Sequence, residues 1–189
     1  MSRAFIALGG NLGPVAARLL TVMAELDELP RSRLLRASSL YRSAPVGYAD
    51  QPDFVNAVAM VDTGLSASEL MRALLALEIR HGRVRGVRNG PRTLDLDLLM
   101  YDEETRDEGF LILPHPRMHE RCFVLAPLLE IAPELAIPGI GPARECFLAL
   151  DDQADVSRLE GMEFDWGYQA MRQLGRGLVP SRSALRMTP

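Results

Sequence analysis

The stretch GPRTLDLDLLMY, Gly90 to Tyr101, decides the fold, because it predicts a β-strand with two aspartates on one face. Side chains alternate between the two faces of a strand, so Asp95 and Asp97 point one way while the leucines beside them point the other. The two carboxylates would then lie roughly 7 Å apart, a span that two divalent cations about 3.5–4 Å apart can bridge. The alternative is a half-exposed strand whose outer face merely carries aspartate.

The segments that precede this strand predict a small mixed sheet with two helices. Strands are predicted at Ala4–Leu8, Arg33–Ser43 and Phe54–Val61, and helices at Pro14–Leu29 and from Ser66 or Ser68 to Gly82. The order strand, helix, strand, strand, helix, strand is typical of the ferredoxin-like β-α-β-β-α-β fold. We therefore expect an α+β domain with a four-stranded, mostly antiparallel sheet and both helices on one face, followed by an added C-terminal strand and helices.

The residues after this core predict few further elements. A short extended piece is expected at Phe110–Leu113 and an apolar helix at Val124–Ile131. Beyond Leu150 the charges are mixed and the periodicity is weak, so no chemistry is predicted there. Residues 1–150 are accordingly interpreted as a single domain, and residues 151–189 as a C-terminal extension of unknown role.

Composition limits the classes of function. The chain has 189 residues and a net charge of −4, which argues against binding the backbone of a nucleic acid. Every basic residue is arginine, so chemistry that depends on lysine, such as a P-loop or a Schiff base, is excluded. The two cysteines, Cys122 and Cys146, have no metal-ligand spacing and indicate reduced thiols. With no apolar leader and no span of transmembrane length, we expect a soluble cytoplasmic protein that does not bind membranes.

Four arginines occupy one glycine-containing segment that has no acidic residue between Gly82 and Thr93. These are Arg83, Arg85, Arg88 and Arg92. Like charges repel one another, so such a concentration favours an anion such as a polyphosphate as the partner. Because the glycines give the segment freedom, it is also expected to close over a substrate as a lid does.

Four other positions could carry chemistry. His115 lies between two prolines, which fix its backbone, and it is either a phosphate ligand or a loop histidine with a local hydrogen bond. Phe54 and Phe123 could stack on a planar heterocycle, although a phenylalanine is usually a core residue. Asn56, on the same strand face as Phe54, could read the donors and acceptors of such a ring.

A family resemblance rests on these same residues. The segments FVNAV (residues 54–58), GRVRGVRNGPRTLDLDLL (82–99) and PHPRMHERCFVLAPLLEIAP (114–133) together resemble 6-hydroxymethyl-7,8-dihydropterin pyrophosphokinase of folate biosynthesis. The likeness runs from about Ala4 to Leu150. It implies an enzyme that uses ATP and magnesium to move a pyrophosphoryl group onto the pterin hydroxymethyl oxygen, through attack at the β-phosphorus, with release of AMP.

The resemblance also implies roles for individual residues. Asp95 and Asp97 would hold two Mg²⁺ ions, and Asp97 would take the hydroxyl proton unless metal activation makes a dedicated base unnecessary. Arg83 and Arg92, with Asp97, would act on the transferred group. The ATP site would comprise Glu78, Arg85, Arg92, Leu98, Ile112, His115 and Arg121. The pterin site would comprise Ser43, Ala44, Val46, Phe54, Asn56 and Phe123.

Two other classes of protein share parts of this pattern. A nucleotidyl transferase or cyclase also uses paired aspartates and two metals, but the acidic net charge and absent lysines disfavour a nucleic-acid substrate. An RNA-recognition module would display stacking aromatics on its sheet, whereas only 6% of the residues here are aromatic. We therefore expect small-molecule substrates, ATP and the pterin, and a monomeric protein.

Overall fold

The structure is a computed structural model that describes residues 1–45, 47, 50–84, 90–162 and 164. The predicted core is present as β1 (Ser2–Gly10), α1 (Val15–Asp27), β2 (Ser32–Ala37), β3 (Tyr41–Ser43), β4 (Phe54–Thr63), α2 (Ala67–Arg80) and β5 (Asp95–Tyr101). After it come β6 (Arg106–Asp107), β7 (Ile112–Leu113), η1 (Met118–Glu120), α3 (Cys122–Ile131), β8 (Ala136–Ile137), β9 (Gly141–Pro142), α4 (Ala143–Leu148), η2 (Asp152–Asp155) and β10 (Val156–Arg158).

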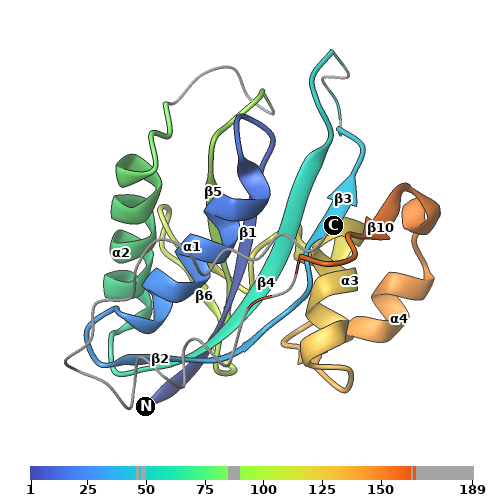
Figure 1. Cartoon of the computed structure of the whole chain (residues 1–189). Helices are drawn as coiled ribbons and strands as arrows, with labels where there is room; N and C mark the ends of the chain where they lie inside the picture. The colour runs from blue at the N-terminus through green and yellow to red at the C-terminus, as the bar shows by residue number, and fades with distance from the viewer. Residues whose placement is uncertain (46, 48–49, 85–89, 163, 165–189) are drawn as a thin grey trace.

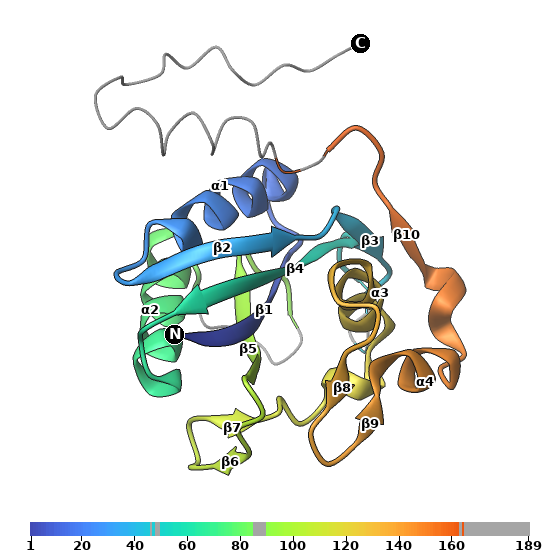
Figure 2. The same cartoon turned by 90° about the horizontal axis from the view of Figure 1, so that it is seen from below.

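The main sheet has the strand order β10, β3, β4, β1, β5, and β2 also pairs with β4. All of these pairs are antiparallel. Leaving β10 aside, the order is that of a ferredoxin-like sheet, so the predicted α+β fold is confirmed. Figures 1 and 2 show α1 and α2 on one side of the sheet and α3 with α4 on the other.

Alternation along the central strand β1 divides the core between the two faces. Ala4, Ile6 and Leu8 pack with α1 and α2, whereas Phe5 belongs to a second cluster with α3. Because successive side chains point to opposite faces, one apolar strand serves both layers. The face toward α3 is the one that carries Asp95 and Asp97.

The single strand predicted at Arg33–Ser43 is wrong, since two strands, β2 and β3, occupy this stretch. Ala37 pairs with Ala59 of β4, and Tyr41 pairs with Asn56 of β4. The stretch from Ala37 to Tyr41 is therefore one residue longer than the stretch of β4 that it faces. The Ser38 hydroxyl accepts a hydrogen bond from the backbone N–H of Val58 at 2.9 Å and so replaces part of the backbone ladder. An extra residue moves every later side chain to the other face, which places Tyr41 and Ser43 on the α3 side.

The other boundaries are close to those predicted, with one exception. Ser66 is the N-cap of α2, and its hydroxyl and Glu69 form a capping box. The extended piece predicted at Phe110–Leu113 is shorter, because only Ile112–Leu113 forms a strand. No sequence pattern predicted α4 or β10, and β10 extends the main sheet beyond β3 (Figure 2).

Candidate active site

Asp95 and Asp97 lie on the open face of β5, as their spacing predicts. Across β1 they are opposite Gly9 and Ala7, whose small side chains leave space above the sheet. Leu96, between them, is 1% exposed and packs in the core under α1 and α2. Both aspartates line a pocket between this face of the sheet and the start of α3.

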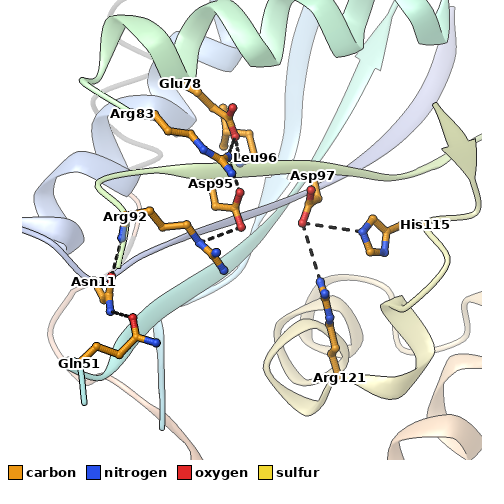
Figure 3. Close-up of polar contacts among 10 residues, drawn as sticks. All are labelled: Asn11, Gln51, Glu78, Arg83, Arg92, Asp95, Leu96, Asp97, His115 and Arg121. Atoms are coloured by element: carbon orange, nitrogen blue, oxygen red, sulfur yellow. Dashed lines mark hydrogen bonds and ion pairs between the residues drawn. The ribbon is translucent and has the colours of Figure 1, made fainter. Parts of the chain in front are cut away.

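Two arginines from the predicted anion-binding segment hold Asp95 (Figure 3). Nη1 of Arg83 bridges Oδ1 of Asp95 and Oε1 of Glu78, and Nε of Arg92 lies 3.0 Å from Oδ2 of Asp95. Although Nε of Arg92 is buried, it has no partner with hydrogen-bond geometry among the described residues. The guanidinium therefore neutralises Asp95 and retains a buried donor for a further acceptor.

Glu78 joins α2 to β5 behind this cluster. Its side chain is 4% exposed, and Oε1 accepts a hydrogen bond of 2.7 Å from the backbone N–H of Leu96. Burial raises the pKa of Glu78, while the hydrogen bond from Leu96 and the charge of Arg83 oppose this shift. A buried carboxylate needs such partners, so Glu78 fixes both the strand and the arginine that reaches Asp95.

Asp97 has looser neighbours than Asp95. Its Oδ2 is 3.9 Å from Nε2 of His115 and 3.9 Å from Nη1 of Arg121. These distances exceed those of direct hydrogen bonds, so the oxygen keeps its lone pairs for another ligand. Burial, and then the charge of Asp95, raise the pKa of Asp97.

The tautomer of His115 follows from its hydrogen bond. Nδ1 lies 3.2 Å from the backbone N of Arg117, whose N–H it accepts. Burial lowers the pKa of His115 and favours the neutral ring, although Asp97 opposes this shift. In the neutral ring the proton is therefore on Nε2, which is the atom that faces Asp97.

Asn11 is a positioning residue that the sequence did not reveal. Its Oδ1 accepts from the backbone N–H of Arg92 at 2.9 Å, and its own backbone N–H donates to the carbonyl of Arg92 at 2.9 Å. Its side-chain amide also donates to Gln51 at 2.9 Å and to the carbonyl of Pro52 at 3.0 Å. Asn11 follows two glycines, which indicated only a turn.

At the other end of the pocket lie the two predicted aromatics and Asn56. Phe54 and Asn56 are 8% and 5% exposed, and Phe123 packs beside the α3 cluster. The side-chain amide of Asn56 donates to Oγ of Ser43 at 2.9 Å, which fixes its orientation. Arginines contact both rings, with the guanidinium carbon of Arg92 5.1 Å from the Phe54 centroid and that of Arg121 5.7 Å from the Phe123 centroid.

The structure brings most of the predicted residues together. Those that line the pocket are Ser43, Ala44, Phe54, Asn56, Arg92, Asp95, Asp97, Arg121 and Phe123, and Glu78, Arg83 and His115 border it through the contacts above. Leu98 and Ile112 do not line it, and Val46, Arg85 and Arg88 lie outside the described residues. Sequence reasoning missed Arg117 and Glu120, although both lie in the segment 114–133 that carries the family resemblance. It also missed Asp152, which lines the pocket from the extension, where no pattern was recognised.

Within the described ranges, no group of three or more histidine, cysteine, aspartate or glutamate side chains is arranged to hold a metal ion. In that same part of the chain, no helix has the length and apolarity needed to cross a bilayer. Both cysteines are free thiols, as predicted.

The fold and the pocket define a ferredoxin-like α+β domain with a carboxylate pair and guanidinium groups at one end of a pocket and aromatic rings at the other. Residues 5–133 match the family model described as 7,8-dihydro-6-hydroxymethylpterin-pyrophosphokinase. The chain belongs to this family.

Individual relatives agree with this assignment. Over 138 residues the chain is 46% identical to a 2-amino-4-hydroxy-6-hydroxymethyldihydropteridine pyrophosphokinase of Pseudomonas aeruginosa, covering 73% of this chain and 85% of that one. Over 179 residues it is 38% identical to a protein of the same name from Synechocystis, covering 95% and 87%.

Solved structures share the fold. A Plasmodium falciparum HPPK-DHPS crystallised with pterin and p-hydroxybenzoate superposes with a TM-score of 0.62 at 14% identity. The match covers 83% of this chain but only 45% of that one. At this identity the likeness supports the architecture alone.

Proposed function

We propose that the protein transfers a pyrophosphoryl group from ATP to the hydroxymethyl oxygen of 6-hydroxymethyl-7,8-dihydropterin, a step in folate biosynthesis. The observation that carries the proposal is one pocket with Asp95 and Asp97 at one end and Phe54, Asn56 and Phe123 at the other. The first end suits a metal-bound triphosphate and the second a planar heterocycle. Family membership supports the same reaction.

The metal end fits Mg²⁺. This ion is commonly held by one or two carboxylates, with water and substrate phosphates completing its octahedron, so a pair of aspartates without a third acidic ligand is a suitable donor set. Asp95 and Asp97 would hold two Mg²⁺ ions, because the distance between the two carboxylates along the strand suits a pair of neighbouring ions. When bound, the ions supply charge neutralisation for the triphosphate.

The arginines would change partners when ATP binds. Arg83 and Arg92 pair with Asp95 in the structure, and the buried Nε of Arg92 lies near this carboxylate without a hydrogen bond to a described residue. Phosphate oxygens are strong acceptors that fit the guanidinium fork, so both side chains would turn toward the triphosphate as the carboxylate takes up metal. Arg85 and Arg121 would add to this clamp.

Other groups would hold the nucleotide in place. His115 presents Nε2–H toward Asp97 and would donate to a phosphate oxygen beside it. Glu78, with the backbones of Leu98 and Ile112, would contribute on the nucleotide side, as the family resemblance implies.

The pterin would lie between Phe54 and Phe123, where stacked rings favour a planar partner. Asn56, held by Ser43, would present its amide to the ring edge together with the backbone of Ala44 and Val46. The hydroxymethyl oxygen would then attack the β-phosphorus, the bond to the α-phosphoryl oxygen would break, and AMP would leave. Asp97 would accept the hydroxyl proton, unless metal activation alone lowers the pKa of the alcohol.

Product analysis tests this proposal. Incubation with ATP, Mg²⁺ and the hydroxymethyl dihydropterin should give AMP and the pterin diphosphate in equal amounts. Accumulation of ADP, or release of AMP without the pterin, would contradict a pyrophosphoryl transfer. Removal of Mg²⁺ with a chelator should stop turnover. The dependence of the rate on free Mg²⁺ should show that a second ion is needed in addition to the one bound in MgATP.

The proposal includes the state of the protein in the cell. A net charge of −4 and free thiols support a monomer in the cytoplasm that acts on small molecules, without a nucleic-acid or membrane partner. Light scattering after gel filtration tests the monomer, and filter binding at low salt tests the absence of nucleic-acid binding.

A further inference from the structure

The segment beyond residue 150 supplies one wall of the pocket. Asp152, the first residue of η2, lines the pocket together with Ser43, Ala44 and Phe123. It lies past residue 133, where the family match ends, and in the part of the chain for which the sequence predicted no chemistry. The question is whether Asp152 acts on the substrate.

Three contacts fix this segment against the domain. Nε2 of Gln153 donates to the carbonyls of Phe147 at 3.0 Å and Leu150 at 2.8 Å. Strand β10 then pairs with β3 in a register that sets Val156 opposite Ser43. The backbone N–H of Leu159 donates to the carbonyl of Leu40 at 2.8 Å. Asp152 is therefore held at a defined position beside the pocket.

Asp152 differs from the other carboxylates that line the pocket. Asp95 and Asp97 face arginine or histidine side chains, and Glu120 lies 3.5 Å from Nε of Arg117. Asp152 has no ion pair with a described residue, and its carboxylate lies near the Cys122 thiol, whose pKa is raised to about 12 by burial and then by Asp152. The carboxylate thus retains acceptor capacity toward the pocket, because two oxygens offer about four lone-pair sites.

Its location is the heterocycle end. The strand order of the main sheet is β10, β3, β4, β1, β5. The aspartate pair lies on β5 at one edge, whereas η2 leads directly into β10 at the opposite edge. Figures 1 and 2 show β10 along the outer edge of β3, next to α3. Asp152 therefore lies at the end where Ser43 and Asn56 lie, across the sheet from the phosphate end.

The chemistry at that end complements a carboxylate. A pterin presents an exocyclic amino group beside a ring N–H, two parallel donors arranged as in a guanidinium. A carboxylate accepts both at once, which a single amide such as Asn56 cannot do. We infer that Asp152 is a specificity-determining residue, whose carboxylate accepts hydrogen bonds from the 2-amino group and adjacent ring N–H of the substrate. This inference rests on the proposed function.

The test compares Asp152→Asn with wild type. Asparagine keeps the volume and one acceptor for Cys122, but turns an N–H₂ donor toward the donors of the ring. Its neighbour Asp151, which is exposed and makes no capping hydrogen bond, provides the matched control Asp151→Asn. Each protein is titrated with 6-hydroxymethylpterin and with the 2-oxo analogue 6-hydroxymethyllumazine, in the presence of MgATP analogue, and KM and kcat are measured for both substrates.

The expected result is a change in discrimination. Wild type and Asp151→Asn should bind the pterin at least tenfold more tightly than the lumazine. Asp152→Asn should weaken pterin binding about tenfold, so that its affinities for the pterin and the lumazine become nearly equal. KM for ATP should not change. Asp152→Glu should recover part of the discrimination, and thermal unfolding should show that all variants fold.

Two results would overturn the inference. One is a pterin-to-lumazine ratio in Asp152→Asn equal to that of the control. The other is an equal loss of affinity for pterin, lumazine and ATP, which would mean that Asp152 only supports the wall. If the wild-type protein neither binds the pterin nor forms AMP, the proposed function itself fails. If the wild-type protein is active and Asp152→Asn discriminates between the two substrates as well as wild type does, only the inference about Asp152 fails.

Discussion

Asp95 and Asp97 have different surroundings although they are two residues apart. Both oxygens of Asp95 contact arginine side chains, whereas Oδ2 of Asp97 is 3.9 Å from Nε2 of His115 and 3.9 Å from Nη1 of Arg121. Asp95 is therefore already neutralised, and Asp97 is the carboxylate with more freedom to accept a ligand or a proton. The two positions should respond differently to substitution.

Asp97→Asn should lower kcat by about a thousandfold or more, since the loss of one charged oxygen opposite the triphosphate costs about 4 kcal/mol or more in the transition state. Pterin affinity should change less than threefold, because the substitution lies at the phosphate end. Steady-state kinetics and a pterin titration measure the two effects. The exposed Asp107 on β6 offers a control, Asp107→Asn, which should be neutral. A fully active Asp97→Asn enzyme would exclude this role.

Glu78 is a second prediction at the scale of single residues. Glu78→Leu should lower the free energy of unfolding by about 1–3 kcal/mol, because the buried N–H of Leu96 loses its acceptor and the guanidinium of Arg83 loses one of its two carboxylate partners. Glu78→Gln should cost less, since its carbonyl oxygen still accepts from Leu96. Urea denaturation followed by circular dichroism compares the two, and equal costs would show that the hydrogen bond from Leu96 contributes nothing.

At the scale of elements, the end of β1 and the entry to β5 hold the site in register. Gly10 closes β1, and a Cβ built there would lie 2.6 Å from the carbonyl oxygen of Thr93. Asn11 follows and pairs with Arg92. The close approach of two backbones is thus what sets Arg92 and Asp95 beside each other, and only glycine permits it.

Gly10→Ala should therefore destabilise the fold by about 1–3 kcal/mol and also reduce kcat, because the segment that carries Arg92 must move. Gly64→Ala is the control, since its nearest contact, with the Cβ of Arg31, would be at 3.3 Å and is therefore much less severe than the 2.6 Å contact at Gly10. Urea titration and AMP release measure both effects. An active, stable Gly10→Ala protein alongside a damaged Gly64→Ala protein would contradict the argument.

The elements also show where sequence reasoning stopped. Helices α1 and α2 and strands β1, β4 and β5 follow from local periodicity and were predicted. The break between β2 and β3 depends on Ser38 bonding to a strand twenty residues away, and the pairing of β10 depends on the free edge of β3. Neither partner is visible within a local window, so neither feature could be predicted.

At the scale of the whole molecule, the C-terminal segment returns to the domain that begins the chain. Phe164 is 9% exposed and belongs to the cluster under α1 and α2, and Leu159 packs against the same cluster. The described part of the extension thus contributes to the pocket through Asp152 and to the main core through Phe164.

Phe164→Ala should lower the free energy of unfolding by about 3 kcal/mol, the cost of a large aromatic removed from a core. Phe110→Ala is the matched control, because Phe110 is 56% exposed and should cost less than about 1 kcal/mol. Chemical denaturation measures both variants. Equal stabilities would show that the extension does not support the core.

The sequence by itself determined the elements of the core, the common face of Asp95 and Asp97, and the candidate residues of both ends of the pocket, because periodicity and motif spacing are local properties of the chain. Only the tertiary structure decided that Arg83 and Arg92 contact Asp95, that Asn11 positions Arg92, and that Asp152 reaches the heterocycle end. Apart from the pair Arg92–Asp95, which is three residues apart, these contacts join residues distant in sequence. Their partners are selected by packing and strand register, which no local pattern encodes.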